Sequence, residues 1–273
     1  MKRIVSIEFM LIIPVFMFMF IFYVFPMFKM LGMSFWNEGF TFQEYVNIFQ
    51  TDLYYRVFFR SLEIALYVTI ISLLIGYPLA YYITYSKQKL LLFGVVAISM
   101  WLGVIIRSYG WMGVLGENGL LNFFISSLGI PTESLLYNRG AVIVGMVHIL
   151  LPYMVLPLFA VMSNIPDNVL RASNSLGATN PYTFIKVYFP LSLPGILAGS
   201  LLVFIQAIGF YITPALLGGK DEVMIAQLIE IQVNELLNWP FASALATTLL
   251  LITTLSLIVS SRVVPLKLLW GGK

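Results

Sequence analysis

The charged side chains that could do chemistry in this chain are few, and several stand beside long apolar runs. Glu63 follows Arg60 by three residues near the start of one run, and Arg107 closes another. An ionisable group inside a membrane-crossing run is costly, so both are candidate functional residues. Glu63 could pair with Arg60 on one helix face, or it could attract a cation at the mouth of a cavity. Arg107 could reach the headgroups, or it could brace Glu63 or Glu117 internally.

Uncharged residues within the runs form a second set of candidates. Trp101 precedes Arg107 by six residues. It could pack in a helix bundle, or its ring could hold an ammonium group by a cation–π contact worth roughly 0.5–2 kcal/mol. Gln206 needs hydrogen-bond partners, so we expect it to face protein or water and not lipid. We expect His148 to be a hydrogen-bonded residue of the bundle.

Motifs of catalysis and of nucleotide binding are missing from the sequence. There is no GxxxxGK[ST] pattern, since the internal Gly219-Lys220 pair is followed by Asp221. There is also no GxSxG or HExxH, no cysteine, and His148 is the single histidine. We therefore expect neither an enzyme, nor a metal site, nor a cofactor bound by this chain itself.

The elements that must position these residues are membrane helices. The 273 residues are 60% hydrophobic and 10% charged, whereas a soluble domain carries about 25% charged residues. A crossing helix needs about 20 apolar residues, and continuous apolar runs favour helices. The sequence therefore predicts an all-α polytopic membrane protein, in one domain over 1–273. Its six predicted spans are 9–28, 64–86, 90–106, 141–163, 187–219 and 241–261.

Three of these runs carry further expectations. The first is too long for a signal-peptide core, so we expect it to be retained as a helix. The third is short and is expected to continue past Arg107. The fifth is too long for one crossing, so part of it is expected to lie along the surface or to tilt.

Basic residues orient the chain. With the N-terminus in the cytoplasm, the inner segments hold Lys2, Arg3, Lys87, Lys89, Arg171, Lys186, Arg262, Lys267 and Lys273. The outer segments hold fewer, namely Lys29, Arg56, Arg60, Arg107, Arg139 and Lys220. By the positive-inside rule, both termini are predicted to be cytoplasmic. The net charge of +3 gives no reason to expect nucleic acid.

Residues 164–190 interrupt the apolar sequence with a predicted cytoplasmic hairpin. Asn164 can cap a short helix, Pro166 suits its first turn, and Gly177 supplies a left-handed exit. A second helix is expected to begin with Asn180 as cap and Pro181 at its first position. Val169, Ala172 and Leu176 share one face of the first helix. The hairpin could rest on lipid headgroups, or it could dock a cytoplasmic partner.

The hairpin resembles the "EAA" loop of ABC importer permeases. The order Ala172, Leu176, Gly177, Ala178, then Pro190 and Pro194-Gly195 carries the resemblance. It extends to IIRSYG (105–110), GENGLLN (116–122), LLPYMVLPL (150–158), the run 195–219 and NWPFASA (238–244). This ordered set is closest to the spermidine/putrescine-type permeases and covers most of the chain from about residue 60.

The resemblance implies the type I ABC importer permease fold and import driven by ATP on another chain. Its expected partners are two cytoplasmic ATP-binding subunits that hold ATP and Mg, a second permease chain, an extracytoplasmic substrate-binding protein and membrane lipid. The implied coupling residues are Arg171, Ala172, Ser173, Leu176, Gly177, Ala178 and Pro181. The implied substrate path contains Trp101, Glu63, Gln206, Phe210, Tyr211 and Arg107. The implied location is the bacterial inner membrane.

The sequence departs from the family at two places. Arg171, Ala172 and Ser173 stand where Glu-Ala-Ala is usual, so any pairing of that glutamate with the ATPase must differ here. Pro214 stands where a polyamine permease can carry an aspartate. Polyamine remains the leading substrate, with opines, amino-acid-like solutes and other small organic ions as alternatives. An ATP-independent carrier is a weaker alternative, because neither an internal repeat nor an ionisable relay is visible. A membrane scaffold without transport is weaker still.

Overall fold

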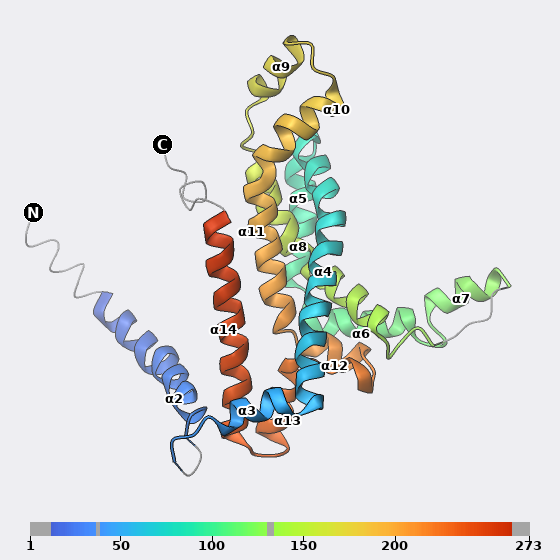
Figure 1. The fold of residues 1–273 in the computed structure, drawn as a ribbon. Helices are drawn as coiled ribbons and strands as arrows, with labels where there is room; N and C mark the ends of the chain where they lie inside the picture. The colour runs from blue at the N-terminus through green and yellow to red at the C-terminus, as the bar shows by residue number, and fades with distance from the viewer. Residues whose placement is uncertain (1–11, 37–38, 130–133, 264–273) are drawn as a thin grey trace, which may run out of the picture. The chain divides into compact units, whose positions relative to one another are not determined.

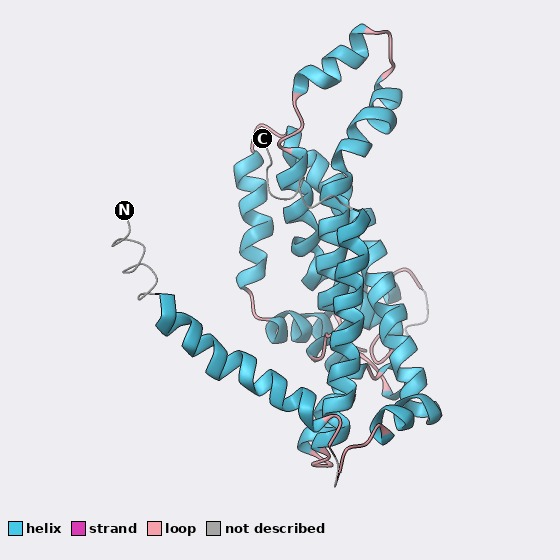
Figure 2. Ribbon diagram, turned by 60° about the vertical axis from the view of Figure 1, so that its left-hand side comes forward, coloured by secondary structure: helices cyan, strands magenta, loops and turns pink. Residues whose placement is uncertain are grey.

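Helices make up most of the part of the chain that the structure describes. The computed structural model describes residues 12–36, 39–129 and 134–263, drawn in Figures 1 and 2. Besides helices, these residues form one isolated bridge, between Trp36 and Phe40. The all-α prediction is therefore confirmed. Both chain ends, which the orientation prediction places in the cytoplasm, lie outside the described residues.

The helical elements follow one another with short connections. In chain order they are η1 (Phe20–Val24), α2 (Phe25–Met33), α3 (Gln43–Gln50), α4 (Asp52–Tyr85), α5 (Lys89–Ile98), η2 (Ser99–Trp101), α6 (Val104–Leu115), α7 (Leu120–Ser127), α8 (Arg139–Met162), α9 (Asp167–Ser175), α10 (Asn180–Thr183), η3 (Phe184–Tyr188), α11 (Phe189–Ile208), α12 (Ile212–Leu217), η4 (Lys220–Glu222), α13 (Ile225–Asn234) and α14 (Trp239–Val263).

The predicted spans are recognisable in these helices. Five segments are long and apolar enough to cross a membrane: Ile12–Met33, Asp52–Tyr85, Arg139–Met162, Asn180–Ile208 and Trp239–Val259. A sixth candidate is a bent pair, Lys89–Trp101 and Val104–Ser127, whose arms differ in direction by 96°. The polytopic class with five to six candidate spans is thus confirmed.

The third predicted span continues past Arg107 as expected, in α6, but it is broken before that residue, which the sequence did not predict. Leu102 has an extended backbone with ψ 124°, and Gly103 is the N-cap from which α6 starts in a new direction. An extended residue cannot continue the helical hydrogen-bond ladder, so the axis changes direction here.

The long fifth run, part of which is expected to lie along the surface or to tilt, is divided between two helices. Its helical part begins at Asn180, passes through the π-turn η3 and ends at Ile208. Gly209 and Phe210 separate it from the short helix α12. Thr213 on α12 shares a 2.9 Å hydrogen bond with Ser108 on α6, which joins the two restarted segments.

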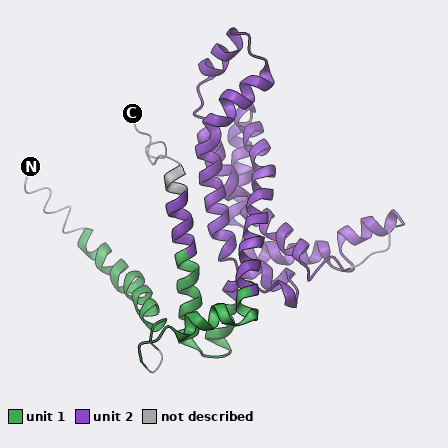
Figure 3. Ribbon diagram, viewed as in Figure 1, with its two compact units in different colours: residues 1–55, 228–251 green, residues 56–227, 252–273 purple. Residues whose placement is uncertain are grey.

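The contacts divide the chain into two compact units, coloured in Figure 3. The first takes its described residues from 1–55 and 228–251. It includes the ring contact of Tyr54 with Phe241, at 4.7 Å between centroids, and a cavity of about 490 Å³. The second takes its described residues from 56–227 and 252–273, and it contains the hairpin and all the predicted site residues.

The core of the second unit is built on the close packing of α8 against α11. A Cβ added at Gly199 would lie 3.0 Å from the Met154 carbonyl oxygen, and one at Gly195 would lie 3.2 Å from the Pro157 oxygen. Small residues four apart let two helix backbones approach closely in this way. A Cβ added at Gly76 on α4 would lie 2.9 Å from Met154 Cγ, so α4 also packs closely on Met154. These glycines therefore serve the close packing of the helices.

Candidate functional site

The hairpin of α9 and α10 extends beyond the ends of α4, α8 and α11 in both ribbon views (Figures 1 and 2). Its elbow is Gly177, whose φ of +86° is in the left-handed region that glycine adopts without penalty. The Gly177 amide donates to the Asn174 carbonyl at 3.0 Å, and the Ala178 amide donates to the Ser173 carbonyl at 3.2 Å. This pair of bonds is a Schellman ending, which satisfies the last carbonyls of α9. The predicted left-handed exit is confirmed.

The cap positions differ from the prediction by two residues for α9 and by one residue for α10. Asn164 does not cap α9, because its side chain donates to the Ala160 carbonyl at 2.7 Å and so closes α8. The N-cap of α9 is Pro166. Thr179, and not Asn180, is the N-cap of α10, which places Pro181 in its first turn. Helix ends are the least sharply encoded part of a helix pattern.

Side-chain bonds hold the two limbs of the hairpin together. The Thr183 hydroxyl on α10 donates to Asn174 Oδ1 at 2.9 Å and lies 2.9 Å from the Ser173 hydroxyl. Both partners belong to α9. Thr183 is buried by this contact. The elbow is therefore fixed both by its backbone ending and by a cross-link of polar side chains.

One face of the hairpin is apolar and open. Leu176 is 89% exposed, and Val169 and Ala172 on the same face are also exposed. A cavity of about 530 Å³ opens beside the elbow. It is lined by Ser173, Leu176, Gly177, Ala178, Thr179 and Tyr182. Arg171 is exposed on α9. Of the predicted coupling residues, Ser173, Leu176, Gly177 and Ala178 thus meet at one cavity.

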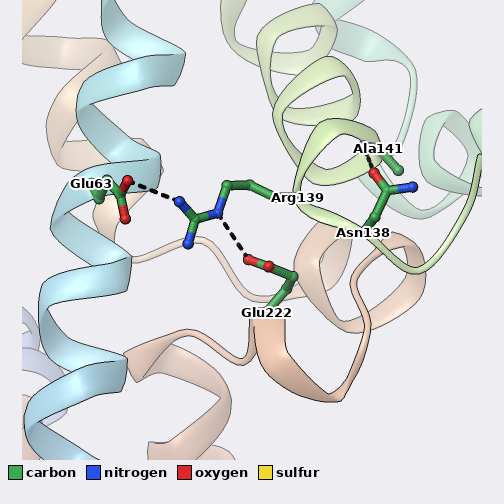
Figure 4. Close-up of polar contacts among 5 residues, drawn as sticks. All are labelled: Glu63, Asn138, Arg139, Ala141 and Glu222. Atoms are coloured by element: carbon green, nitrogen blue, oxygen red, sulfur yellow. Dashed lines mark hydrogen bonds and ion pairs between the residues drawn. The ribbon is translucent and has the colours of Figure 1, made fainter.

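At the other end of the bundle, Arg139 joins three elements of the second unit (Figure 4). Its Nη1 lies 2.8 Å from Glu63 Oε1 on α4, and its Nε lies 3.4 Å from Glu222 Oε2 on η4. Arg139 is the first residue of α8, and Asn138 caps that helix by accepting from the Ala141 amide at 3.0 Å. The expected partner of Glu63, either Arg60 or Arg107, is corrected to Arg139. Sequence reasoning placed Arg139 only in an outer loop.

Arg107 is buried, with 8% of its surface exposed. It therefore does not extend to the headgroups, and it braces neither Glu63 nor Glu117. Its Nη1 donates to the Ile149 carbonyl on α8 at 3.3 Å, and its Nε is buried without a hydrogen-bond partner in the described structure. The guanidinium joins α6 to α8 through a neutral acceptor.

The remaining predicted path residues lie at the two breaks. Trp101 ends the η2 turn and is 91% exposed, so the interpretation that it packs within this chain is wrong. Gln206 is exposed near the end of α11, while Phe210 is half-buried and Tyr211 is exposed just after it. A glutamine exposed on a membrane span is expected to face protein or water, which favours a subunit surface or a path here.

A pair that sequence reasoning did not connect lies between α6 and α8. The indole Nε1 of Trp111 donates to His148 Nδ1 at 3.1 Å, and the two rings meet edge to face at 5.7 Å. His148 is hydrogen-bonded as expected, but it is exposed instead of buried in the bundle. The two residues are 37 apart in the chain, and no feature of the sequence around Trp111 indicated this partner. Among the described residues, no group of three or more His, Cys, Asp and Glu side chains could hold a metal ion.

Comparison with known proteins gives relatives along most of the chain, although no family model matches. The spermidine/putrescine transport system permease protein PotB of Escherichia coli (strain K12) is 35% identical over 233 residues, covering 84% of this chain and 84% of that protein. PotB of Haemophilus influenzae is 36% identical over 235 residues, covering 85% and 82%. The inner membrane ABC transporter permease protein YdcU of Escherichia coli (strain K12) is 30% identical, covering 76% and 71%.

Solved structures support the fold. A chain of the bacterial alginate ABC transporter, in complex with its alginate pentasaccharide-bound periplasmic protein, superposes with a TM-score of 0.73 at 19% identity, covering 96% and 94% of the two chains. A chain of the inward-facing MetNI methionine ABC transporter gives a TM-score of 0.58 at 19% identity, covering 76% and 93%. The sequence relatives decide the family, and the superpositions confirm the type I ABC importer permease fold. The chain therefore belongs to the spermidine/putrescine-type permeases, the membrane subunits of binding-protein-dependent ABC importers.

Proposed function

We propose that this chain moves a polyamine such as spermidine or putrescine into the cytoplasm by alternating access. As an ABC permease subunit it does not hydrolyse ATP, and ATP and Mg belong to the partner ATPase. We propose that it acts as one transmembrane domain beside a second, heterologous permease chain. Two cytoplasmic ATP-binding subunits and an extracytoplasmic binding protein complete the transporter, which resides in the inner membrane of a bacterium.

The observation that carries this proposal is the open apolar surface at the Gly177 elbow. Leu176 presents its side chain to solvent beside a cavity of about 530 Å³, whereas burying a leucine is worth roughly 1.5–3 kcal/mol. A helix hairpin with an apolar tip fits a groove in a partner protein. We propose that the ATPase supplies that groove, and that closure of the ATPase dimer moves the hairpin and tilts the spans. In this arrangement Arg171 presents a cation to the ATPase where the family usually has a glutamate. The group on the ATPase that contacts Arg171 is therefore a hydrogen-bond acceptor.

The substrate path is proposed to follow the breaks in the third and fifth spans. Trp101, Gln206 and Tyr211 are exposed there, and their aromatic faces and amide suit an organic ammonium group. Glu63 is held by Arg139 at 2.8 Å, so it contributes to the path as one member of an ion-pair cluster and not as a lone carboxylate. Pro214 is buried and offers no charge. Weak contacts spread over several residues favour passage of the substrate over tight binding of it.

Orientation can be tested directly, because the chain contains no cysteine. A single Leu176→Cys variant should react with a membrane-impermeant maleimide only in inside-out vesicles. A single Lys220→Cys variant should react only in right-side-out vesicles, because Lys220 is at the opposite end in the proposed topology. Labelling of Leu176→Cys from the outside would overturn the coupling role.

Transport can be tested with the purified components. The chain should co-purify with a cytoplasmic ATPase, and proteoliposomes holding the complex should take up labelled spermidine only with ATP inside and the binding protein outside. Leu176→Asp should remove both the ATPase from the purified complex and the uptake, whereas Gln88→Asp, at an exposed position just before α5 that does not line the elbow cavity, is the control. Uptake of an opine or amino acid in preference to polyamine would reassign the substrate. Uptake without ATP would identify a secondary carrier.

A further inference from the structure

A small cavity lies where the hairpin leaves the bundle, separate from the cavity at the elbow. Its volume is about 230 Å³, and its walls come from the ends of α4 and α8 and the starts of α5 and α9. We call it the root cavity, and its lining residues are Thr84, Tyr85, Lys89, Met162, Ser163, Ile165 and Asp167. Pockets that enclose a drug-sized molecule are roughly 300–1,000 Å³. The root cavity therefore fits a small polar group and not a whole organic solute.

Opposite charges line the root cavity from two different helices. Lys89 is the first residue of α5, and Asp167 is the first residue of α9. Within the described residues, neither side chain forms an ion pair or a hydrogen bond, although Asp167 interacts electrostatically with Tyr85, another lining residue. A ligand that carries both signs of charge gives each of these side chains a partner at once, through charge-assisted hydrogen bonds. The cavity is therefore suited to a zwitterionic group.

Two hydroxyl groups add a donor and an acceptor to the cavity. Thr84 donates its hydroxyl hydrogen to the Ala80 carbonyl at 2.8 Å, so its Oγ1 can still accept a hydrogen bond. The Ser163 hydroxyl makes no hydrogen bond within the described residues, so it can donate to a ligand. Met162 is buried and supplies an apolar wall. The lining thus offers donors for an anionic group and acceptors for a cationic group that bears hydrogens.

The root cavity stands at the level where three candidate spans leave the membrane. Asp52–Tyr85 and Arg139–Met162 both end at the cavity, and the bent pair begins there with Lys89. Spans of this kind cross the hydrocarbon, and their ends lie in the headgroup region on either side of it. Leu90, the residue after Lys89, is 78% exposed, which is consistent with contact with hydrocarbon beside the cavity. A lipid headgroup is therefore the small polar group that this position brings to the cavity.

We propose that the root cavity binds the headgroup of a phospholipid that carries a primary ammonium group as well as its phosphate. Lys89 and the Ser163 hydroxyl donate to the phosphate, and Asp167 and Thr84 Oγ1 accept from the ammonium group. The acyl chains of the lipid stay in the bilayer. Because Asp167 begins α9, a bound headgroup connects the first residue of that helix to α4 and α5. Binding of this lipid requires neither an ATPase nor transport.

The test measures how much lipid the purified full chain retains in detergent, by native mass spectrometry. Phosphatidylethanolamine should be retained about fivefold more than phosphatidylcholine, whose ammonium group has no N–H to donate, since about fivefold is the upper end for a partly exposed ion pair. Phosphatidylglycerol, which has no ammonium group, should also be retained less. Asp167→Asn should remove most of the preference for phosphatidylethanolamine over phosphatidylcholine. Lys89→Gln should lower the retention of both lipids, because both present a phosphate.

Lys87→Gln is the matched control, because Lys87 is an exposed cation of the same loop that does not line the cavity, and it should retain lipid as the wild type does. Equal retention of the three lipids, or an unchanged preference in Asp167→Asn, would overturn the proposal. Displacement of phosphatidylethanolamine by an equal concentration of free O-phosphoethanolamine would overturn it too, since the ligand would then be a soluble zwitterion.

The remaining alternative is that Lys89 and Asp167 pair directly with each other and the cavity needs no ligand. Lys89→Gln and Asp167→Asn would then each lower the melting temperature in lipid-free detergent, and the double variant would lower it no further. That result would overturn the proposal. A lipid that bridges the two residues predicts instead that both single variants melt as the wild type does until phosphatidylethanolamine is added, and that the lipid then stabilises the wild type more than either variant.

Discussion

Substitution of Gly177 tests how far coupling depends on one backbone angle. Its φ is +86°, and no atom lies within 4 Å of an added Cβ, so Gly177→Ala meets no steric clash. The cost is that of holding an L-residue in the left-handed region, about 1–2 kcal/mol. An energy of this size lowers the population of the folded elbow by a factor of about 5–30. Asparagine tolerates this conformation better, so Gly177→Asn should lose less.

Two assays on the purified complex would measure this series: the amount of co-purifying ATPase and the rate of ATP-driven uptake. The expected order is glycine, then asparagine, then alanine, with Gly177→Asp inactive because it also places a charge at the proposed docking surface. Each variant should remain inserted in the membrane. Gly94→Ala on α5 is the control, since an added Cβ there also meets nothing within 4 Å. If alanine transported as well as glycine, and better than asparagine, the elbow geometry would not govern coupling.

Three further substitutions address the packing and the charges. Arg139→Gln should destabilise the protein by about 1–2 kcal/mol, because Glu222, with only 14% of its side chain exposed, is left without its cation. Adding Glu63→Gln to that variant should lower the melting temperature little further. Gly199→Val should cost about 2 kcal/mol or more, because its side chain would meet the Met154 carbonyl, and a melting temperature unchanged from wild type would contradict the packing of α8 on α11. Arg107→Met should leave the melting temperature unchanged or raise it, because it removes a buried charge that bonds only to the Ile149 carbonyl within the described residues. A large fall in melting temperature would show that the charge stabilises the fold.

Local sequence was a good guide wherever the determining interaction was local. The spans follow from hydropathy, because any long apolar run in a membrane must satisfy its backbone within itself. The Gly177 elbow follows from the left-handed preference of glycine after a helix, and the structure gives it the expected positive φ. The helix caps beside it were displaced by two residues in α9, where Asn164 bonds back to α8, and by one residue in α10.

Pairings between distant segments were not predictable in the same way. Glu63 and Arg139 are 76 residues apart in the chain, and Trp111 and His148 are 37 apart. Nothing in either neighbourhood specifies such a partner. Arg60 was closer in sequence to Glu63, yet the partner that the fold supplies is on another helix. The exposure of Trp101 was unpredictable for the same reason, because composition alone does not distinguish the surface of a bundle from its interior.

The sequence by itself determined that this is a helical membrane protein with a glycine-hinged hairpin, because apolar length and backbone preference are properties of short segments. Only the tertiary structure decided where the third and fifth spans break, that Arg107 is buried against a neutral carbonyl, and that Arg139 gathers two carboxylates. Those features depend on which helices are in contact and on where along their axes the contact lies. That choice is made by packing summed over the whole bundle, and no single stretch of residues encodes it.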